Sequence, residues 1–298
     1  MPKGDNAENR SDNRSRQDAG AAGIEPTQLN SDKKLRAKSV LVLGGVDFDG
    51  GADQASATDR KSGSPILFPP LPGSLVEANK IALLAKKCNF SVVELTGKAA
   101  SKSNFLKNLA GNSFVHLATH GFFFDESSIG SMGQSMEKKS RGVQIKERIY
   151  AGLESRNPLV ESGLAFTGAN LFSQNTQESK PGVLTAEELV DADMRNCQLV
   201  VLSACDTGRG KQLTGQGVLG LRSSVMAAGA RNVLMSLWKI PDDVTVLLMD
   251  EFYKNLWQEN LAPAHALRKA QATLQKQLPP AISKPKFWAG WVLVGEGW

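Results

Sequence analysis

The chain has 298 residues, enough for one large α/β domain or two small ones. Apolar residues make up 41% and charged residues 22%, as in ordinary globular proteins, and no apolar run approaches the roughly 18 residues that span a membrane. The net charge of +5 comes from scattered lysines and arginines without interleaved aromatic residues. We therefore expect neither nucleic acid nor a membrane among the partners.

The N-terminal segment, residues 1–37, is rich in Asn, Asp, Ser, Arg, Gly and Ala and has almost no apolar side chains. Such a segment cannot offset its ordering entropy, so we predict a disordered polar tail. It lacks the apolar core of a signal peptide. The three cysteines of the chain are widely spaced and form no CxxC pair, which fits neither a disulfide framework nor a zinc site. These features predict a cytoplasmic protein with free thiols.

From residue 38 onward, the pattern predicts strands that alternate with helices. The expected strands are 39–48, 90–97, 113–119, 197–204, 232–238 and 287–295, and the expected helices are 71–88, 101–110, 182–194, 217–230, 242–258 and 262–278. We expect Ser74 and Glu77 to form a capping box at the first helix and Thr185 to cap the third. The polar region 125–158 is expected to be a long surface excursion. This order predicts an α/β fold with a doubly wound, mostly parallel sheet and helices on both faces.

Two polar residues stand where strands are expected to end. His120 follows the apolar run of "FVHLATHGFFF" (114–124), and Cys205 begins the Gly-rich part of "LVVLSACDTGRG" (199–210). Sites in doubly wound sheets form at the carboxyl ends of strands. If the two strands are neighbours, the imidazole lowers the pKa of the thiol and so supplies thiolate, the actual nucleophile. His120 can then protonate a departing amine.

Backbone amides complete this hypothesis. Attack on an amide creates an oxyanion that needs N–H donors, and a glycine beside the histidine lets the backbone approach a substrate closely. We therefore expect the amides of Gly121 and Cys205 to form an oxyanion hole. This chemistry needs no metal and no organic cofactor.

The other histidines and cysteines have plainer interpretations. Cys88 and Cys197 fit the role of small hydrophobic residues. His116 lies deeper in the same strand as the apolar run before His120, and we expect a satisfied core or supporting residue. His265, in the last helix, is expected to be structural.

The motifs of this chain resemble those of the CHAT domain, a caspase-like family in the same clan as the separases. The resemblance runs in order from about residue 39 to 298 and rests on "LVLGGVDF", "LPGSLVEANKIA", "FVHLATHGFF", "NPLVESGLAFTGAN", "GVLTAEELVDADM", "LVVLSACDTGRG", "GQGVLGLRSSVMAAGARNVLMSLWKIPDD", "EFYKNL", "ALRKAQATL" and "FWAGWVLVGEG". It implies a caspase-like fold, a CHAT peptidase domain over residues 38–298, and a Cys/His dyad at Cys205 and His120. The positions of His120 and Cys205 at expected strand ends indicate the same pair.

The family resemblance implies a cysteine endopeptidase that cleaves peptide bonds of a protein substrate. CHAT domains are often fused to tetratricopeptide repeats, and no helical repeat precedes the domain here. We therefore expect a separate regulatory or repeat-containing protein as a second partner. The alternative is a catalytically silent caspase-like scaffold that acts by docking a partner. A nucleotide-binding domain is disfavoured, because "GGVDFDGG" is not a GxGxxG motif and has no phosphate-binding lysine.

In caspase-like sheets the P1 side chain of the substrate descends between strand ends near the nucleophile. The candidates to line this pocket are Asp47, Asp49, Ser203 and Asp243. Asp243 and its neighbour Asp242 could instead cap the helix that follows, and the sequence leaves both roles open. Carboxylates in the pocket would favour a basic or long unbranched P1 residue over Asp, for which no arginine pair is evident.

Overall fold

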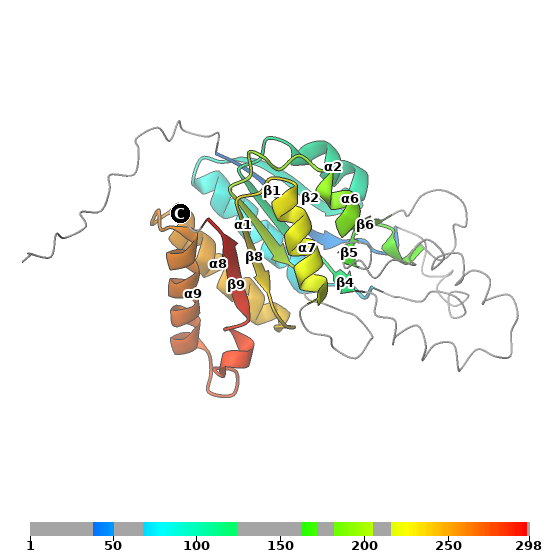
Figure 1. The fold of residues 1–298 in the computed structure, drawn as a ribbon. Coiled ribbons are helices and arrows are strands. Elements are labelled where there is room, and N and C mark those ends of the chain that lie inside the picture. Colours follow the sequence, from blue (N-terminus) through cyan, green and yellow to red (C-terminus); the bar gives the residue numbers. More distant parts are fainter. Residues whose placement is uncertain (1–37, 51–67, 124–161, 172–181, 205–215, 297–298) are drawn as a thin grey trace, which may run out of the picture. The chain divides into compact units, whose positions relative to one another are not determined.

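The computed structural model describes residues 38–50, 68–123, 162–171, 182–204 and 216–296 (Figure 1). The strands are β1 (Ser39–Val46), β2 (Ser91–Gly97), β3 (Phe114–Ala118), β4 (Gly121–Phe123), β5 (Ser162–Ala165), β6 (Val183–Thr185), β7 (Leu199–Ser203), β8 (Asn232–Ser236) and β9 (Trp291–Gly295). The helices are α1 (Pro72–Lys87), α2 (Lys102–Leu109), α6 (Ala186–Val190), α7 (Gln216–Ala227), α8 (Asp242–Trp257) and α9 (Pro263–Gln277), with short 3₁₀ turns η3 (Ala169–Leu171) and η4 (Pro285–Phe287). The predictions for the tail at 1–37 and the excursion at 125–158 lie outside the described residues.

A six-stranded sheet forms the centre of the domain, with the strand order β2-β1-β3-β7-β8-β9. Neighbouring strands pair in parallel, except that β9 runs antiparallel to β8. Helices α1, α8 and α9 pack on one face, and α2, α6 and α7 pack on the other (Figure 1). The predicted doubly wound, mostly parallel sheet with helices on both faces is confirmed.

A second, antiparallel sheet of three short strands, β4-β5-β6, lies beside this arrangement. The sequence analysis did not predict it, because strands of three or four residues are too short to show a period. Strand β6 continues directly into α6 at Thr185. The hydroxyl of Thr185 accepts a hydrogen bond from the Glu188 amide, and the Glu188 carboxylate accepts one from the Thr185 amide. The predicted cap at Thr185 is confirmed.

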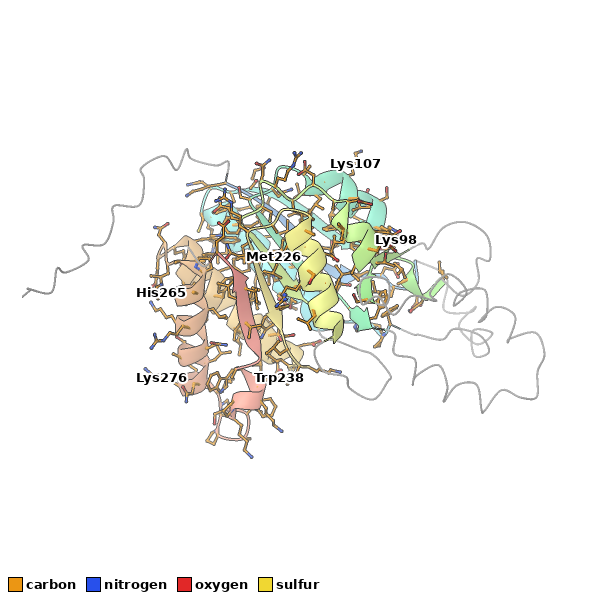
Figure 2. All side chains as sticks on the ribbon, in the orientation of Figure 1. Lys98, Lys107, Met226, Trp238, His265 and Lys276 are labelled. Atoms are coloured by element: carbon orange, nitrogen blue, oxygen red, sulfur yellow. The ribbon has the colours of Figure 1, made fainter. Side chains whose placement is uncertain are left out.

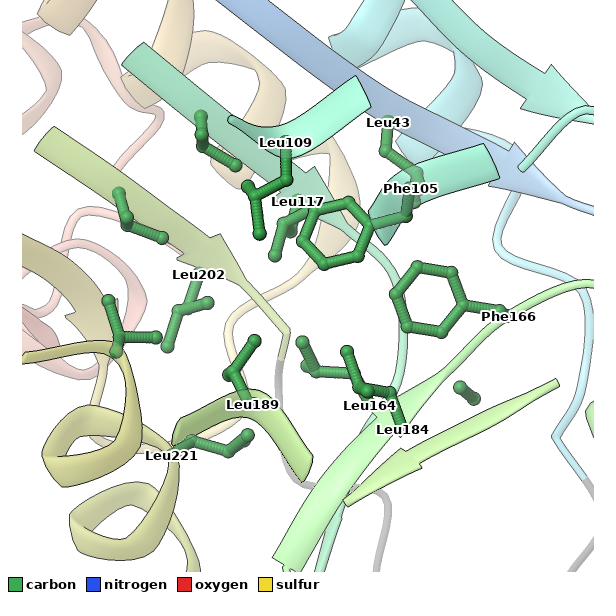
Figure 3. Close-up of a cluster of buried hydrophobic side chains, with 14 of the residues drawn as sticks. Leu43, Phe105, Leu109, Leu117, Leu164, Phe166, Leu184, Leu189, Leu202 and Leu221 are labelled. Atoms are coloured by element: carbon green, nitrogen blue, oxygen red, sulfur yellow. The ribbon is translucent and has the colours of Figure 1, made fainter. Parts of the chain in front are cut away.

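Two hydrophobic clusters hold the helices against the two faces of the sheet. Strand residues contribute to them alternately, so that Val42 belongs to one cluster and Leu43 to the other. Figure 3 shows the cluster that contains Leu43, in which Leu117, Leu202 and Phe105 of α2 also lie. Because both faces are covered, the central strands are apolar at nearly every position, as expected of a parallel sheet.

The start of α1 differs from the prediction. Its N-cap position is Leu71, without a side-chain cap, and Pro72 is the first helical residue, where its missing N–H costs nothing. The predicted capping box at Ser74 and Glu77 is therefore wrong. Ser74 instead donates to the carbonyl of Leu71 and accepts from the amide of Gly45, at 2.7 and 2.9 Å. These bonds tie the first turn of α1 to the end of β1.

Candidate active site at the carboxyl edge of the sheet

The carboxyl ends of β3 and β7 lie side by side at one edge of the sheet. The strands pair in parallel, with Ala118 opposite Ser203. His120 follows Ala118 by two residues, and Cys205 follows Ser203 by the same interval, although Cys205 itself lies outside the described residues. A Cβ placed on Gly121 would lie 3.3 Å from the carbonyl oxygen of Ala204, the residue before Cys205. The edge therefore brings together the chain segments that carry the predicted dyad.

The imidazole of His120 is only 1% exposed and is held from two sides. Its Nε2 lies 2.7 Å from the carbonyl oxygen of Pro69. Because a carbonyl only accepts, Nε2 carries the proton and donates it, and Nδ1 keeps its lone pair in the neutral ring. The rings of Phe48 and Phe68 lie against the imidazole, with centroid distances of 4.9 and 5.6 Å. These contacts fix both the orientation and the tautomer of the ring.

Burial lowers the pKa of His120 from its ordinary value of 6.5, because the charged imidazolium loses hydration. The hydrogen bond to Pro69 and the charge of Asp242 raise this pKa, and Lys239 lowers it further, but desolvation is the largest influence. The imidazole is therefore neutral at pH 7, the form that accepts a proton.

Strand β5 fixes the bend that carries His120. The hydroxyl of Thr119 donates to the carbonyl of Ala165, and the amide of Ala165 donates to the carbonyl of His120 at 2.9 Å. The bend between β3 and β4 is thus held by two hydrogen bonds to a single residue. The small second sheet therefore contributes directly to the position of the site.

A pocket of about 240 Å³ opens beside His120, between the sheet edge and the first turns of α1 and α8. Its polar lining comprises, besides His120, the residues Ser74, Glu77, Thr119, Ser203, Lys239, Asp242 and Thr245. One carboxylate therefore comes from each helix, and one hydroxyl comes from the end of each of the two central strands.

The polar side chains Glu77 and Thr245 have unfilled hydrogen-bonding capacity. The Glu77 side chain is 4% exposed, and its Oε1 lies 3.0 Å from Nε2 of His116, an ion-pair distance at which neither atom forms a hydrogen bond within the described part of the chain. The buried hydroxyl of Thr245 likewise has no hydrogen-bond partner among the described residues. Buried polar atoms without partners are costly. This part of the pocket therefore suits a ligand group that donates hydrogen bonds.

His116 is fully buried between α1 and α8. Its Nδ1 lies 3.1 Å from the hydroxyl of Tyr253, and its Nε2 faces Glu77. Burial raises the pKa of Tyr253 well above 10, and the charge of Glu77 adds to this rise, so the hydroxyl stays protonated and can donate to Nδ1. Both ring nitrogens of His116 therefore face protein groups, Tyr253 at Nδ1 and the Glu77 carboxylate at Nε2.

The structure brings only part of the predicted substrate pocket together. Ser203 lines the pocket, whereas Asp47, Asp49 and Asp243 are not among its lining residues. Asp243 accepts a hydrogen bond from the next backbone amide in the first turn of α8, at 2.9 Å. Asp242, which could have capped the helix, lines the pocket, and the N-cap position of α8 is Pro241.

The remaining candidates lie away from the pocket lining. Cys197 is buried, which raises the pKa of its thiol to about 12, so its thiolate is scarce at neutral pH. Cys88 is partly buried at the C-cap position of α1. His265 lies on the exposed side of α9, where Figure 2 shows it at the edge of the domain. Within the described ranges, no cluster of His, Cys, Asp or Glu could hold a metal ion, and no helix there is long and apolar enough to cross a membrane.

Sequence reasoning missed the role of Glu77 and the contribution of Pro69 and Thr245. Glu77 had a usable signal, because it stands four residues before Ile81 on the buried face of α1, where a charged residue is unusual. Pro69 contributes only its carbonyl group, which no residue pattern reveals. The hydroxyl of Thr245 could equally have faced solvent.

Comparison with known proteins gives first the class of the domain and then its family. The structure is similar to that of the Arg specific cysteine proteinase gingipain R (RGPB), with a TM-score of 0.50 and 10% sequence identity, over 88% of this chain and 46% of that one. The predicted caspase-like α/β fold is thereby confirmed. Residues 11–296 match the CHAT domain, and the chain belongs to the CHAT domain family.

The curated relatives are much longer proteins. The chain is 26% identical over 236 residues to tetratricopeptide repeat protein 28 of Homo sapiens, and equally to that of Mus musculus. The alignment covers 77% of this chain but 9% of each relative. This likeness therefore concerns one small segment of those proteins.

Proposed function

We propose that the chain is a cysteine endopeptidase that hydrolyses peptide bonds of a protein substrate, with Cys205 as nucleophile and His120 as general acid and base. The observation that carries the proposal is the register of β3 and β7, in which Ala118 pairs with Ser203 and each strand is followed at the same interval by one member of the dyad. The CHAT family match and the caspase-like fold support it.

The state of His120 suggests how the reaction proceeds. The ring proton stays on Nε2, which donates a hydrogen bond to the carbonyl of Pro69. The lone pair on Nδ1 then takes the proton of the Cys205 thiol. The thiolate attacks the scissile carbonyl carbon, and the amides of Gly121 and Cys205 are the proposed donors to the oxyanion. The imidazolium returns its proton to the leaving amine as the C–N bond breaks. Water activated by the same imidazole then hydrolyses the thioester.

The pocket suggests the kind of substrate. Glu77 and Asp242 supply carboxylates, and Ser203 and Thr245 supply hydroxyls, within reach of a side chain that enters beside His120. We propose that this side chain is the P1 residue and that it is basic, because a guanidinium or ammonium group donates several hydrogen bonds and carries the complementary charge. Lys239, the one cation among the described lining residues, offsets part of the negative charge.

A second protein partner is also proposed. The relatives are named as tetratricopeptide repeat proteins, and the chain aligns with a small segment of them. We propose that a separate regulatory or repeat-containing protein presents the substrate to this domain, since repeat surfaces are suited to holding extended partners.

The proposal is tested by labelling the purified chain with peptidyl electrophiles that differ at P1. We expect rapid modification of Cys205, loss of labelling in Cys205→Ala, and full labelling in Cys88→Ala and Cys197→Ala, because the Cys197 thiol is buried with a raised pKa. Equal modification of all three thiols, or a folded chain in which Cys205 does not react, would refute the peptidase and leave a docking scaffold.

A further inference from the structure

Asn170 in η3 holds three backbone groups from two other segments of the chain. The side chain is buried, its Oδ1 accepts from the amide of Phe68 at 2.8 Å, and its Nδ2 donates to the carbonyl of Phe68 at 3.0 Å. The same Nδ2 donates to the carboxylate of Asp49 at 3.0 Å. The backbone amide of Asn170 donates to the carbonyl of Phe48 at 2.9 Å. Asn170 therefore joins the loop after β1 to the segment before α1.

The same two segments enclose the imidazole of His120. Phe48 and Phe68 supply the rings that pack against it, and Pro69, the next residue after Phe68, supplies the carbonyl that accepts from Nε2. Asn170 does not contact His120 in any of these interactions. It binds the backbone of Phe48 and Phe68, whose rings contact His120, and Phe68 directly precedes Pro69.

The chemistry of this link requires a carboxamide. Holding both the N–H and the C=O of one residue, Phe68, needs an acceptor and a donor side by side, which Asn and Gln side chains offer and a carboxylate does not. Asn170 therefore satisfies both backbone groups of Phe68 with one side chain.

We propose that Asn170 is a positioning residue for His120: it fixes the Phe48, Phe68 and Pro69 groups so that the ring keeps its Nε2 proton on Pro69 and stays shielded from water. Only the expected effect of Asn170 on turnover rests on the proposed peptidase function. The positioning itself can be measured on the imidazole whether or not the chain is an enzyme.

The test is nuclear magnetic resonance of the histidine rings in the full chain. The chain has three histidines, so the His120 signals are assigned by their absence in His120→Ala. In the wild type we expect the Nε2–H tautomer and a pKa below 6.5. In Asn170→Ala we expect a mixture of tautomers and a pKa shifted up toward 6.5, because the released segment admits water. Labelling of Cys205 should slow at least about 10-fold.

Asn255→Ala is the matched control. Asn255 is equally buried, and its Nδ2 donates to the carbonyl of Ala266 at 3.2 Å, between α8 and α9. This variant should lose stability without any change in the His120 signals.

Asn170→Asp keeps the shape and the acceptor but not the donor, and it replaces Asn170→Ala if the latter does not fold. An unchanged tautomer and pKa of His120 in either folded Asn170 variant would overturn the proposal. Shifted His120 signals beside an unreactive wild-type Cys205 would refute the peptidase and leave the positioning role intact.

Discussion

His116 and His120 come from the same short stretch of chain, yet their ring nitrogens differ in how far protein groups surround them. Inside the core between α1 and α8, Tyr253 lies against one ring nitrogen of His116 and the Glu77 carboxylate lies against the other. At His120, a carbonyl holds one nitrogen, aromatic rings cover the faces, and the ring borders a pocket. A histidine whose two nitrogens both face protein groups can only support the fold. One that borders a pocket is placed to exchange protons with a bound group.

The largest expected effect is that of His120→Ala on turnover. The variant should lose roughly 10²- to 10⁴-fold in kcat/KM, because thiolate formation and leaving-group protonation both depend on the ring. The measurement is the rate of peptide cleavage, with the rate of Cys205 labelling alongside. The comparison breaks if His120→Ala stays active while His116→Ala is the inactive variant.

His116→Ala should have the opposite profile. It removes the partner of the buried Glu77 carboxylate, which is expected to lower the free energy of unfolding by about 3–5 kcal/mol. The folded fraction should label at Cys205 at a rate close to that of the wild type. Urea denaturation gives the stability, and Tyr253→Phe, which loses only the hydroxyl contact, should cost about 1 kcal/mol. A His116→Ala variant as stable as Tyr253→Phe would contradict this assignment.

The pocket carboxylates should set selectivity, and Glu77, which also pairs with the buried His116, should contribute to stability as well. Asp242→Asn and Glu77→Gln are each expected to reduce the preference for Arg or Lys over Met at P1 by about 10- to 100-fold, the equivalent of one charge-assisted hydrogen bond. Asp243→Asn, in the same helical turn but off the pocket, is the matched control and should change nothing. Peptides that differ only in P1 give the answer, and a clear preference of the wild type for Asp would contradict the assignment.

The smallest expected effect is on the pH profile. Because burial lowers the pKa of His120, the acidic limb of kcat/KM should lie below pH 6.5, where the imidazole gains a proton and can no longer act as a base. Phe48→Leu removes part of the shield and should move this limb upward toward pH 6.5. Phe105→Leu, in the same hydrophobic cluster but paired with Phe166, should not move it. An identical shift in both variants would mean that general loosening, not local hydration, sets the pKa.

The fold could largely be predicted from the sequence because its elements are encoded locally. The apolar run of β7 and the Thr185 to Glu188 spacing are visible within a few residues. The capping box at Ser74 failed because a proline at the first helical position was the stronger start signal. The β4-β5-β6 sheet could not be predicted, since its strands depend on contacts between distant segments.

The site was predictable to a lesser degree. A histidine beside a glycine at a strand end is a local signal, and it selected His120. Glu77, Pro69 and Asn170 belong to separate segments, and only the folded chain brings them to the same histidine. Asp242 and Asp243 show the limit of sequence reasoning: adjacent aspartates in one helical turn face different surroundings, and helix geometry alone does not say which one faces the pocket.

The pairing of β3 with β7 also determines when the proposed dyad can exist. The second sheet and α6 lie between these strands in the sequence, and the chain is synthesised from its N-terminus. Bringing the two strands together costs loop-closure entropy before their hydrogen bonds and side-chain contacts can offset it. On the ribosome, the strand that leads to His120 is therefore complete well before the strand that leads to Cys205. Until the sheet closes, the newly made Cys205 thiol keeps the low reactivity of an ordinary cysteine, so the proposed peptidase would be inactive in the unfinished chain.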